Sequence, residues 1–388
     1  LQGVRMDFNL SQEHEILRES VRNFAEKEIK PVARELDCKE EFSYDTMQKM
    51  AELGLFGIVV SEKYGGQGMD YLSYIIATEE IARVDGSHAA TVAAENSLGI
   101  GPLYYFGSEE QKQKYLPKLC SGETLWGFGL TEANAGSDAV ASKTNAVLDG
   151  NEWVINGSKI FITNASTDIT AGVTAMCRTG TREDGKPELS CILVEAGTPG
   201  YTAKIMHGKM MWRASNTSEL YFEDCRVPKE NLLGPRGEGF KQMMRTLDGG
   251  RLSIGAMGLG GAQGCLEMAL RYAGQREQFG MPIGKFQANA FKLADMATEI
   301  DAARLMLYRA CWLRDNDLPF SKEAAMAKLY CSEVMYRCAN HAVQLHGGYG
   351  LMQEYDVERF YRDQKLLEIG EGTSEVQRIV IARHIGAL

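Results

Sequence analysis

The spacing of apolar residues changes twice along this 388-residue chain, and that change limits its possible folds more than any single motif does. From about residue 11 to 122, apolar residues recur every three or four positions, which is typical of amphipathic helices. Between about 125 and 235 the spacing is two, in short runs such as Trp153-Val154-Ile155 separated by Gly, Asn and Asp. After about residue 239 the helical spacing returns. The chain is therefore predicted to have an α+β fold, with a small antiparallel β-domain between two helical domains.

Two local patterns refine this prediction. Asp149-Gly150-Asn151 stands between apolar runs and has the composition of a tight hairpin turn. Further on, apolar residues recur in alternating steps of three and four, which predicts a long helix packed lengthwise in a bundle. Its residues are Phe286, Leu293, Met296, Ile300, Ala303, Leu307 and Ala310. We place the domains at 6–124, 125–238 and 239–388, starting at residue 6 because Met6-Asp7-Phe8 has the appearance of a natural start.

Charge and composition argue against several classes of function. Lys and Arg number 42 against 52 Asp and Glu, so the net charge of −10 gives no basic excess for binding a nucleic acid backbone. No apolar stretch reaches the roughly 18 residues that a membrane-spanning helix needs, and no secretory leader pattern begins the chain. We expect a cytoplasmic protein with no nucleic acid partner and no membrane span.

The cysteines and histidines do not form a metal-site pattern. The nine cysteines are scattered and include no C-x-x-C pair, and the six histidines include no H-x-x-x-H or H-E-x-x-H spacing. We therefore predict reduced core cysteines and no protein-bound metal.

The segment from Gly258 to Gly264 has the glycine content of a dinucleotide-binding loop but not its context. The third glycine comes one position late, and a helical pattern continues beyond it without the strand and the ribose-binding acid of a Rossmann site. We predict instead a helix whose small residues permit close approach to a neighbour or a ligand.

Four other segments carry residues suited to ligand binding, and each also has a plain structural explanation. Arg276 to Gly280 and Gln344 to Gly350 combine polar side chains with glycine-rich helix ends, which bind phosphate or simply terminate helices. Leu130 to Asp138 is rich in small and hydroxylated residues that suit backbone contacts with a flat polar ring. Phe161-Ile162-Thr163 offers an aromatic face and a hydroxyl, although both residue types are also ordinary in strands.

A fifth segment, Ile369 to Gln377, places Glu371 between two glycines directly before an amphipathic helix. A carboxylate flanked by glycines is accessible to a substrate carbon, as a general base must be. The alternative is that the segment only starts a helix, with Thr373 or Ser374 as its N-cap.

Taken together and in their order along the chain, the five segments resemble those of the acyl-CoA dehydrogenase family, flavoproteins that oxidise acyl-CoA thioesters across the α and β carbons. The resemblance extends from about Met6 to the C-terminus. It implies an N-terminal α-helical domain, a middle antiparallel β-barrel domain and a C-terminal four-helix bundle, assembled as a homotetramer. It also implies FAD as cofactor and an external electron acceptor, typically electron-transferring flavoprotein, because the chain has no second redox motif.

The resemblance assigns the cofactor-binding residues by position. Family members often carry Gln or Asn where Glu375 stands. The matching residues are Phe128, Leu130 and Thr131 on one side of the isoalloxazine ring, Phe161 and Thr163 on the other, Arg276, Gln278 and Phe279 toward the FAD of a neighbouring subunit, Gln344, Gly347 and Gly348 near its pyrophosphate, and Thr373 and Glu375.

Glu371 matches the family's catalytic base, which removes an α-proton while a hydride passes from the β-carbon to flavin N5. The carbon acid is weak, so the developing enolate oxygen needs donors; in the family these are the backbone N–H of this glutamate and a ribityl hydroxyl of FAD. Burial against flavin and acyl chain is expected to raise the pKa of Glu371 toward neutrality. Some relatives carry the base at the position of Gly250, and glycine there leaves Glu371 as the one candidate.

The same resemblance assigns the substrate-binding residues. Ser137 matches a position near the CoA pantetheine, and Asp248 and Arg251 match positions that contact the CoA portion. Gly372, next to the base, completes the set. Arg251 has an alternative role as one half of an ion pair within its own domain.

Departures from the family pattern bear on the acyl group. Gly370 stands where many relatives carry tyrosine, which should enlarge the cavity beside the reacting carbons. Ala89 stands where glutaryl-CoA dehydrogenases hold a distal carboxylate with arginine, which disfavours a dicarboxylic substrate. We expect a short, branched or cyclic acyl group and a role in fatty acid or in aromatic or alicyclic acid metabolism.

Glu95, in the helix expected to form the pocket floor, has two possible roles. It could be a second acid/base for 1,4-dehydrogenation of a cyclic enoyl-CoA, or a structural residue that faces solvent or caps a helix. A different class of function is a non-catalytic acyl-CoA-binding family member, but retention of Glu371 and the flavin segments argues against it.

Overall fold

The computed structural model describes residues 8–388, so the start predicted at Met6 lies outside the described residues. Seven helices precede the sheet, and several begin at Ser or Asp N-caps such as Ser11, Asp70 and Asp85, whose side chains accept a backbone N–H of the first turn. The helices are α1 (Gln12–Phe24), α2 (Lys30–Lys39), α3 (Tyr44–Glu52), α4 (Tyr71–Ala82), α5 (Gly86–Ala94), α6 (Ile100–Phe106) and α7 (Glu109–Cys120).

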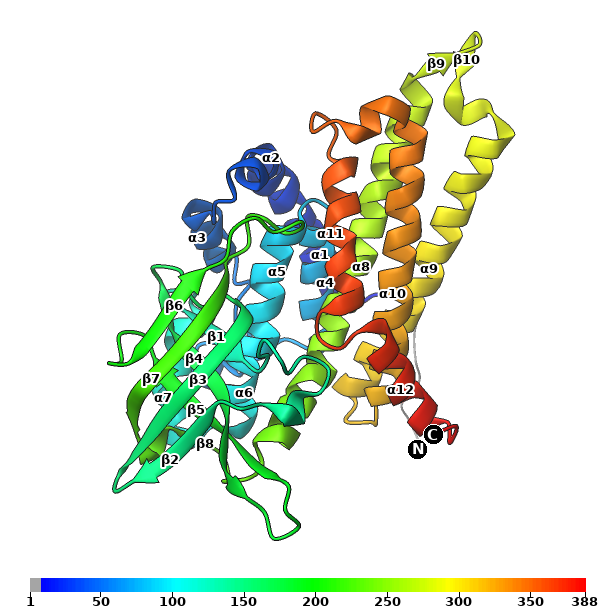
Figure 1. Cartoon of the computed structure of the whole chain (residues 1–388). Helices are drawn as coiled ribbons and strands as arrows, with labels where there is room; N and C mark the ends of the chain where they lie inside the picture. The colour runs from blue at the N-terminus through cyan, green and yellow to red at the C-terminus, as the bar shows by residue number, and fades with distance from the viewer. Residues whose placement is uncertain (1–7) are drawn as a thin grey trace.

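The middle segment forms one twisted sheet with the strand order β6-β7-β3-β2-β4-β5-β8, and β1 pairs with β4 off this path (Figure 1). The hairpin predicted at Asp149-Gly150-Asn151 is confirmed, since β2 and β3 pair through Asp149 and Glu152 and Gly150 adopts φ 60°. The strands are β1 (Leu125–Gly129), β2 (Asn145–Asp149), β3 (Glu152–Thr163), β4 (Thr170–Thr181), β5 (Pro187–Glu195), β6 (Tyr201–Ile205), β7 (Thr217–Pro228) and β8 (Leu232–Leu233).

The prediction of a closed antiparallel barrel was wrong, because the sheet is open and mixed. Its edge strands, β6 and β8, are five and two residues long and do not pair with each other. β1 and β2 run parallel to β4, and the long connection that a parallel pair requires is present between β1 and β4. Alternating apolar residues report only that one face of a strand is buried, so they do not distinguish an open sheet from a closed one.

The C-terminal part is a bundle of long helices, which confirms the predicted order of helical, sheet and helical domains (Figure 1). Most of the periodic residues predicted to face the core of α9 are fully buried, among them Ile300, Ala303 and Leu307. The elements are α8 (Gly239–Gln275), β9 (Glu277–Gln278), β10 (Met281–Pro282), α9 (Gln287–Asp315), α10 (Ser321–His346), α11 (Val357–Ile369) and α12 (Ser374–His384).

The glycines of α8 confirm the prediction of a helix in close contact with its neighbours. A Cβ at Gly260 would lie 2.1 Å from the carbonyl oxygen of Glu79 in α4, and one at Gly258 would lie 2.9 Å from the carbonyl oxygen of Cys331 in α10. The two neighbouring backbones therefore leave no room for a side chain at these positions.

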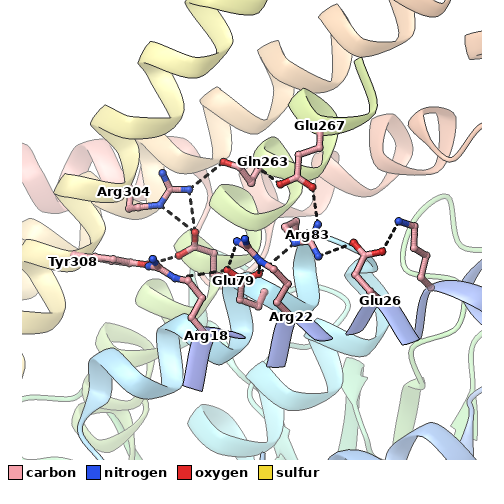
Figure 2. A network of polar contacts seen from close by, with 11 residues as sticks. Arg18, Arg22, Glu26, Glu79, Arg83, Gln263, Glu267, Arg304 and Tyr308 are labelled. Carbon is pink, nitrogen blue, oxygen red and sulfur yellow. Dashed lines mark hydrogen bonds and ion pairs between the residues drawn. The ribbon is translucent and has the colours of Figure 1, made fainter. Parts of the chain in front are cut away.

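Ion pairs and hydrogen bonds connect the N-terminal helices to the C-terminal bundle (Figure 2). Arg83 at the end of α4 donates to Glu267 of α8 at 2.6 Å, and Glu79 of α4 accepts from Arg304 at 3.1 Å and from Tyr308 at 2.6 Å, both on α9. Glu79 is buried and paired with a cation and a hydroxyl, which offsets the cost of removing its charge from water. This network fixes α4 against α8, the helix that carries Gly250 and Arg251.

Neither a membrane-spanning helix nor a metal-binding cluster occurs in the described part of the chain. No helix within residues 8–388 is long and apolar enough to cross a bilayer. The same residues contain no group of three or more His, Cys, Asp or Glu side chains arranged to hold a metal ion.

Candidate active site

The turn between α11 and α12 holds Glu371 in an uncommon backbone conformation. α11 ends at Ile369, and its C-cap Gly370 donates its N–H to the carbonyl of Leu366 at 2.7 Å. Glu371 then adopts φ 52° and Gly372 φ 92°. Glycine adopts a positive φ freely, whereas a glutamate rarely does. Thr373 is the N-cap of α12, since its hydroxyl accepts the N–H of Val376 at 3.3 Å, so the helix-capping interpretation of this segment is confirmed. A non-glycine residue held at positive φ is a feature found at functional sites.

The carboxyl group of Glu371 points at bare backbone rather than into solvent. A Cβ placed on Gly250 of α8 would lie 1.8 Å from its Oε2, so a side chain at that position would displace the carboxyl group. Oε2 is buried, and among residues 8–388 it has no hydrogen-bond partner. Burial raises the pKa of Glu371 to about 7, while the positive charges of Lys328 and Arg251 act in the opposite direction. A carboxyl group with a pKa near neutrality is suited to accept and release a proton.

Two residues that the sequence did not single out hold this turn. Lys328 of α10 is fully buried and donates to the carbonyl of Gly372 at 2.7 Å. Gln377 of α12 donates to the same oxygen at 2.9 Å and to the carbonyl of Glu371 at 3.3 Å. A signal was present, because Lys328 follows Ala324 by four positions and precedes Cys331 by three, which places it on the buried stripe of its helix.

The predicted substrate residues fall into two groups. Arg251 is buried, forms an ion pair with Asp248 one turn earlier in α8, and has its pKa lowered by burial. Asp248 also accepts from Ser321 at 3.1 Å and lines a cavity of about 480 Å³. The intradomain ion pair proposed as the alternative for Arg251 is therefore present, and Gly372 lies at the turn described above. Ser137 is exposed on the loop after β1.

The two sheet segments predicted to hold a flat ring lie side by side. The carbonyl of Thr131 accepts the N–H of Ile160 at 2.9 Å, which places the end of β1 beside β3. Phe128 and Leu130 are largely buried, whereas Phe161 is 62% exposed and held at φ 63°. A large exposed aromatic ring in a strained backbone conformation fits a ligand that covers it. Thr163, at the end of β3, is half-buried.

Six further predicted cofactor residues lie at the end of the bundle that carries the β9–β10 tip (Figure 1). Arg276, Gln278 and Phe279 occupy the β9–β10 tip, where Phe279 is 92% exposed. Gln344, Gly347 and Gly348 lie at the end of α10 near that tip, and stacking of Tyr272 on His346 joins the two helix ends. Gly347 ends α10 with φ 60°, as the C-cap interpretation predicted, and nothing lies within 4 Å of a Cβ at either glycine.

One chain therefore does not bring all predicted cofactor residues together. Thr373 and Glu375 lie by Glu371, at the end of the bundle away from the tip (Figure 1). Glu375 is exposed in the first turn of α12. The predicted cofactor residues of one chain therefore form separate groups.

Glu95 lies in the π-helical segment Glu95–Gly99 after α5 and is fully buried. Its Oε2 accepts the N–H of Trp126 in β1 at 3.1 Å and the Nδ2 of Asn164 after β3 at 3.4 Å, while Oε1 faces Gly99 without a partner among the described residues. Burial raises the pKa of Glu95 to about 8. The side chain thus connects the helical domain to the two strands that carry the predicted ring-binding residues, and it does not face solvent.

Models of one protein family match the chain in three consecutive parts. The acyl-CoA dehydrogenase N-terminal domain matches residues 11–123, the middle domain residues 127–225 and the C-terminal domain residues 237–386.

Curated relatives match over the whole length. The probable acyl-CoA dehydrogenase YngJ of Bacillus subtilis is 54% identical over 380 residues, covering 98% of this chain and 100% of the relative. The short-chain-specific acyl-CoA dehydrogenase of Clostridium acetobutylicum is 46% identical over 380 residues, with the same coverage.

Solved structures share the fold. Butyryl-CoA dehydrogenase of Megasphaera elsdenii is 42% identical, with a TM-score of 0.94 and coverage of 98% of this chain and 100% of that one. A chain from a structure of the electron-transferring flavoprotein of Acidaminococcus fermentans is 45% identical, with a TM-score of 0.94 and coverage of 98% and 99%. An acyl-CoA dehydrogenase of Bacillus anthracis complexed with FAD is 34% identical, with a TM-score of 0.91 and coverage of 98% and 69%.

Proposed function

Because the chain belongs to the acyl-CoA dehydrogenase family, we propose that it oxidises a short-chain acyl-CoA thioester between its α and β carbons with Glu371 as the base. The observation that carries this proposal is the Glu371 turn. It holds a carboxyl group at φ 52° over the bare backbone of Gly250, where burial raises its pKa to about 7. A non-glycine residue held at positive φ costs conformational energy, and such residues cluster at functional sites.

The turn can supply both a base and an oxyanion donor. FAD, when bound, supplies the acceptor for the hydride that leaves the β-carbon. Glu371 takes the α-proton, and its pKa of about 7 keeps a useful fraction ionised at neutral pH while leaving it a competent base. The backbone N–H of Glu371 has no acceptor among the described residues, so it is available to donate to the thioester oxygen as negative charge develops there.

The chain's residues fit FAD as two half-sites. The exposed ring of Phe161 and the neighbouring Thr131 backbone suit the isoalloxazine, and the open backbone at Gly347 and Gly348 suits a pyrophosphate. Since these half-sites lie at opposite ends of one chain, we propose that the Arg276 to Phe279 tip reaches the FAD of a neighbouring subunit in a homotetramer. The Bacillus anthracis relative bound to FAD supports the cofactor assignment.

The proposed substrate is a short straight or branched acyl group. The short-chain-specific and butyryl-CoA relatives support short length. A Cβ at Gly370 would meet nothing closer than 3.4 Å, so this position can carry a side chain, and its absence leaves space beside the base. Ala89 is fully buried and offers no charge for a distal carboxylate. The recorded partners of Glu95 favour a structural role over the 1,4-dehydrogenation of a cyclic enoyl-CoA.

Electron-transferring flavoprotein is the proposed electron acceptor. The structural match to a chain from the Acidaminococcus fermentans electron-transferring flavoprotein structure supports a partner of this kind.

Anaerobic bleaching of the flavin band of the purified protein tests the proposed function. Straight, branched and cyclic acyl-CoA thioesters are added in turn, and the products are identified by mass. We expect butyryl-CoA or a short branched thioester to bleach the flavin and yield a product lighter by two hydrogens. FAD that remains oxidised with every thioester would contradict the proposal. Bleaching by a cyclic enoyl-CoA alone would instead favour the 1,4-dehydrogenation as the reaction.

A further inference from the structure

Lys328 is a buried ammonium group without a paired carboxylate. Its side chain is fully buried, and the carbonyl of Gly372, at 2.7 Å, is its one acceptor among residues 8–388. The other fully buried lysine, Lys159, differs in this respect, since it forms an ion pair with Glu132 at 2.8 Å and donates to two further oxygens. Burying an unpaired charge costs free energy, so packing alone does not explain the presence of Lys328 at this position of α10.

The groups that face Lys328 belong to the candidate active site. Burial lowers the pKa of Lys328 to about 8, and the negative charge of Glu371 opposes this shift more than Glu368 and Glu375 do, while Arg251 adds to it. Glu371 is in turn faced by Lys328 from α10, by Arg251 from α8 and by the hydroxyl-bearing Tyr74 from α4. Lys328 is mostly protonated at the midpoint of the Glu371 titration, because its pKa of about 8 lies above that of Glu371 at about 7.

We propose that Lys328 is a positioning residue for the base, which holds the Glu371–Gly372 turn through the Gly372 carbonyl and keeps Glu371 ionised through its charge. The inference rests on the proposed function of Glu371. Lys328 touches the backbone of the turn rather than the reacting atoms, so its effect passes through Glu371. Gln377 donates to the same carbonyl and to that of Glu371 without carrying a charge. Both residues therefore orient the turn, but of these two only Lys328 also acts on Glu371 through a positive charge, in addition to that of Arg251.

Three variants separate the hydrogen bond from the charge. Lys328→Met removes both, Lys328→Gln removes the charge and keeps an amide donor, and Lys365→Met is the matched control. Lys365 lies near the end of α11, six residues before Glu371, in a surface pair with Glu368. FAD content, thermal unfolding and the pH profile of anaerobic flavin reduction by butyryl-CoA are measured for each variant. The ionisation of Glu371 is followed independently, without substrate, from the infrared carboxyl band that Glu371→Gln removes.

The two parts of the proposal predict different changes. Loss of the charge raises the pKa of Glu371, so the acid limb of the rate profile and the infrared titration move up by about one pH unit in both Lys328 variants. Loss of the hydrogen bond lowers the rate of flavin reduction about tenfold in Lys328→Met at pH values above the acid limb. Lys328→Gln, which keeps an amide donor, recovers most of this rate. Lys365→Met leaves both unchanged.

Several results would overturn the inference. Lys328→Met could fold, contain FAD and keep both the acid limb and the maximal flavin-reduction rate of the unmodified protein. That result would show that Lys328 is only a packing residue. If both Lys328 variants aggregate while Lys365→Met folds, Lys328 is required for folding and not for positioning Glu371. Failure of the proposed function can be distinguished from failure of this inference. In the first case butyryl-CoA would not bleach the unmodified protein, but the infrared titration would still show whether Lys328 shifts the ionisation of Glu371.

Discussion

At the scale of single residues, the burial of Glu95 predicts a pH-dependent stability. Its pKa is raised by burial to about 8, above the ordinary value of 4.5, so the folded state holds a proton that the unfolded state has lost. Folding stability due to this residue is therefore complete at low pH and falls as pH rises between about 4.5 and 8, by up to about 1.4 kcal/mol per pH unit.

Glu95→Gln imitates the protonated side chain and is expected to lose less stability than the native protein as pH rises. Thermal unfolding of both proteins at pH 5.5 and pH 8 measures this difference, with the exposed Glu183→Gln as a control whose effect is the same at both values. Equal shifts for Glu95→Gln at the two pH values would show that Glu95 is ionised in the folded protein. If Glu95→Gln also keeps butyryl-CoA turnover and any cyclic turnover, its role is structural.

Single residues differed in how far the sequence revealed them. Glu371 was predictable because two glycines flank it and the surrounding segment resembles that of a known family. The contacts of Lys328 and Gln377 with the turn were not predictable, because they depend on two helices meeting at the Gly372 carbonyl, from which these residues are 44 and 5 positions away in sequence. The pairing of Glu95 with Trp126 and Asn164 depends on tertiary contacts of the same kind.

At the scale of elements, the small residues of α8 predict a steep cost for added volume. Gly260→Ala would place a Cβ 2.1 Å from the carbonyl oxygen of Glu79, so α4 and α8 would have to separate. We expect a loss of at least about 2 kcal/mol of stability, read as a lower midpoint in urea or heat. Gly274→Ala in the same helix meets nothing within 4 Å and should be neutral or stabilising by about 0.5–1 kcal/mol. Equal midpoints for the two variants would contradict the close packing of α4 on α8.

The helices were more predictable than the sheet. The three-and-four spacing in α9 identified residues that are buried, because a long amphipathic helix repeats its signal over many turns. The β2–β3 hairpin was also predicted, since its turn residues are local. The parallel pairing of β1 with β4 and the open edges were missed, because they depend on which distant strands meet.

At the scale of the whole molecule, the β9–β10 tip predicts that FAD binding needs more than one chain. Phe279→Ala removes a ring that is 92% exposed in the single chain, so it should not alter the fold of the subunit. If the tip contacts the FAD of a neighbour, the variant should bind FAD about tenfold more weakly, equivalent to about 1.4 kcal/mol. Equilibrium dialysis measures the affinity and sedimentation the assembly, with Val147→Ala, an exposed β2 residue, as control. Unchanged FAD affinity would remove Phe279 from the cofactor site.

The assembly marks the limit of what one chain reveals. The predicted cofactor residues lie at two ends of the bundle. The spacing of apolar residues in one sequence does not predict how copies of the chain assemble. The homotetramer therefore rests on the family resemblance and stays a prediction.

The central claim is that Glu371 removes the α-proton, and Glu371→Gln tests it most directly. The amide keeps the size of the side chain over Gly250 but cannot act as a base, so FAD and thioester binding should persist while anaerobic flavin reduction falls by at least about 10³-fold. Stopped-flow bleaching by butyryl-CoA measures the rate, and the FAD content and the spectral shift on thioester binding show that the site is intact. Near-normal bleaching in a variant that binds both ligands would contradict the account.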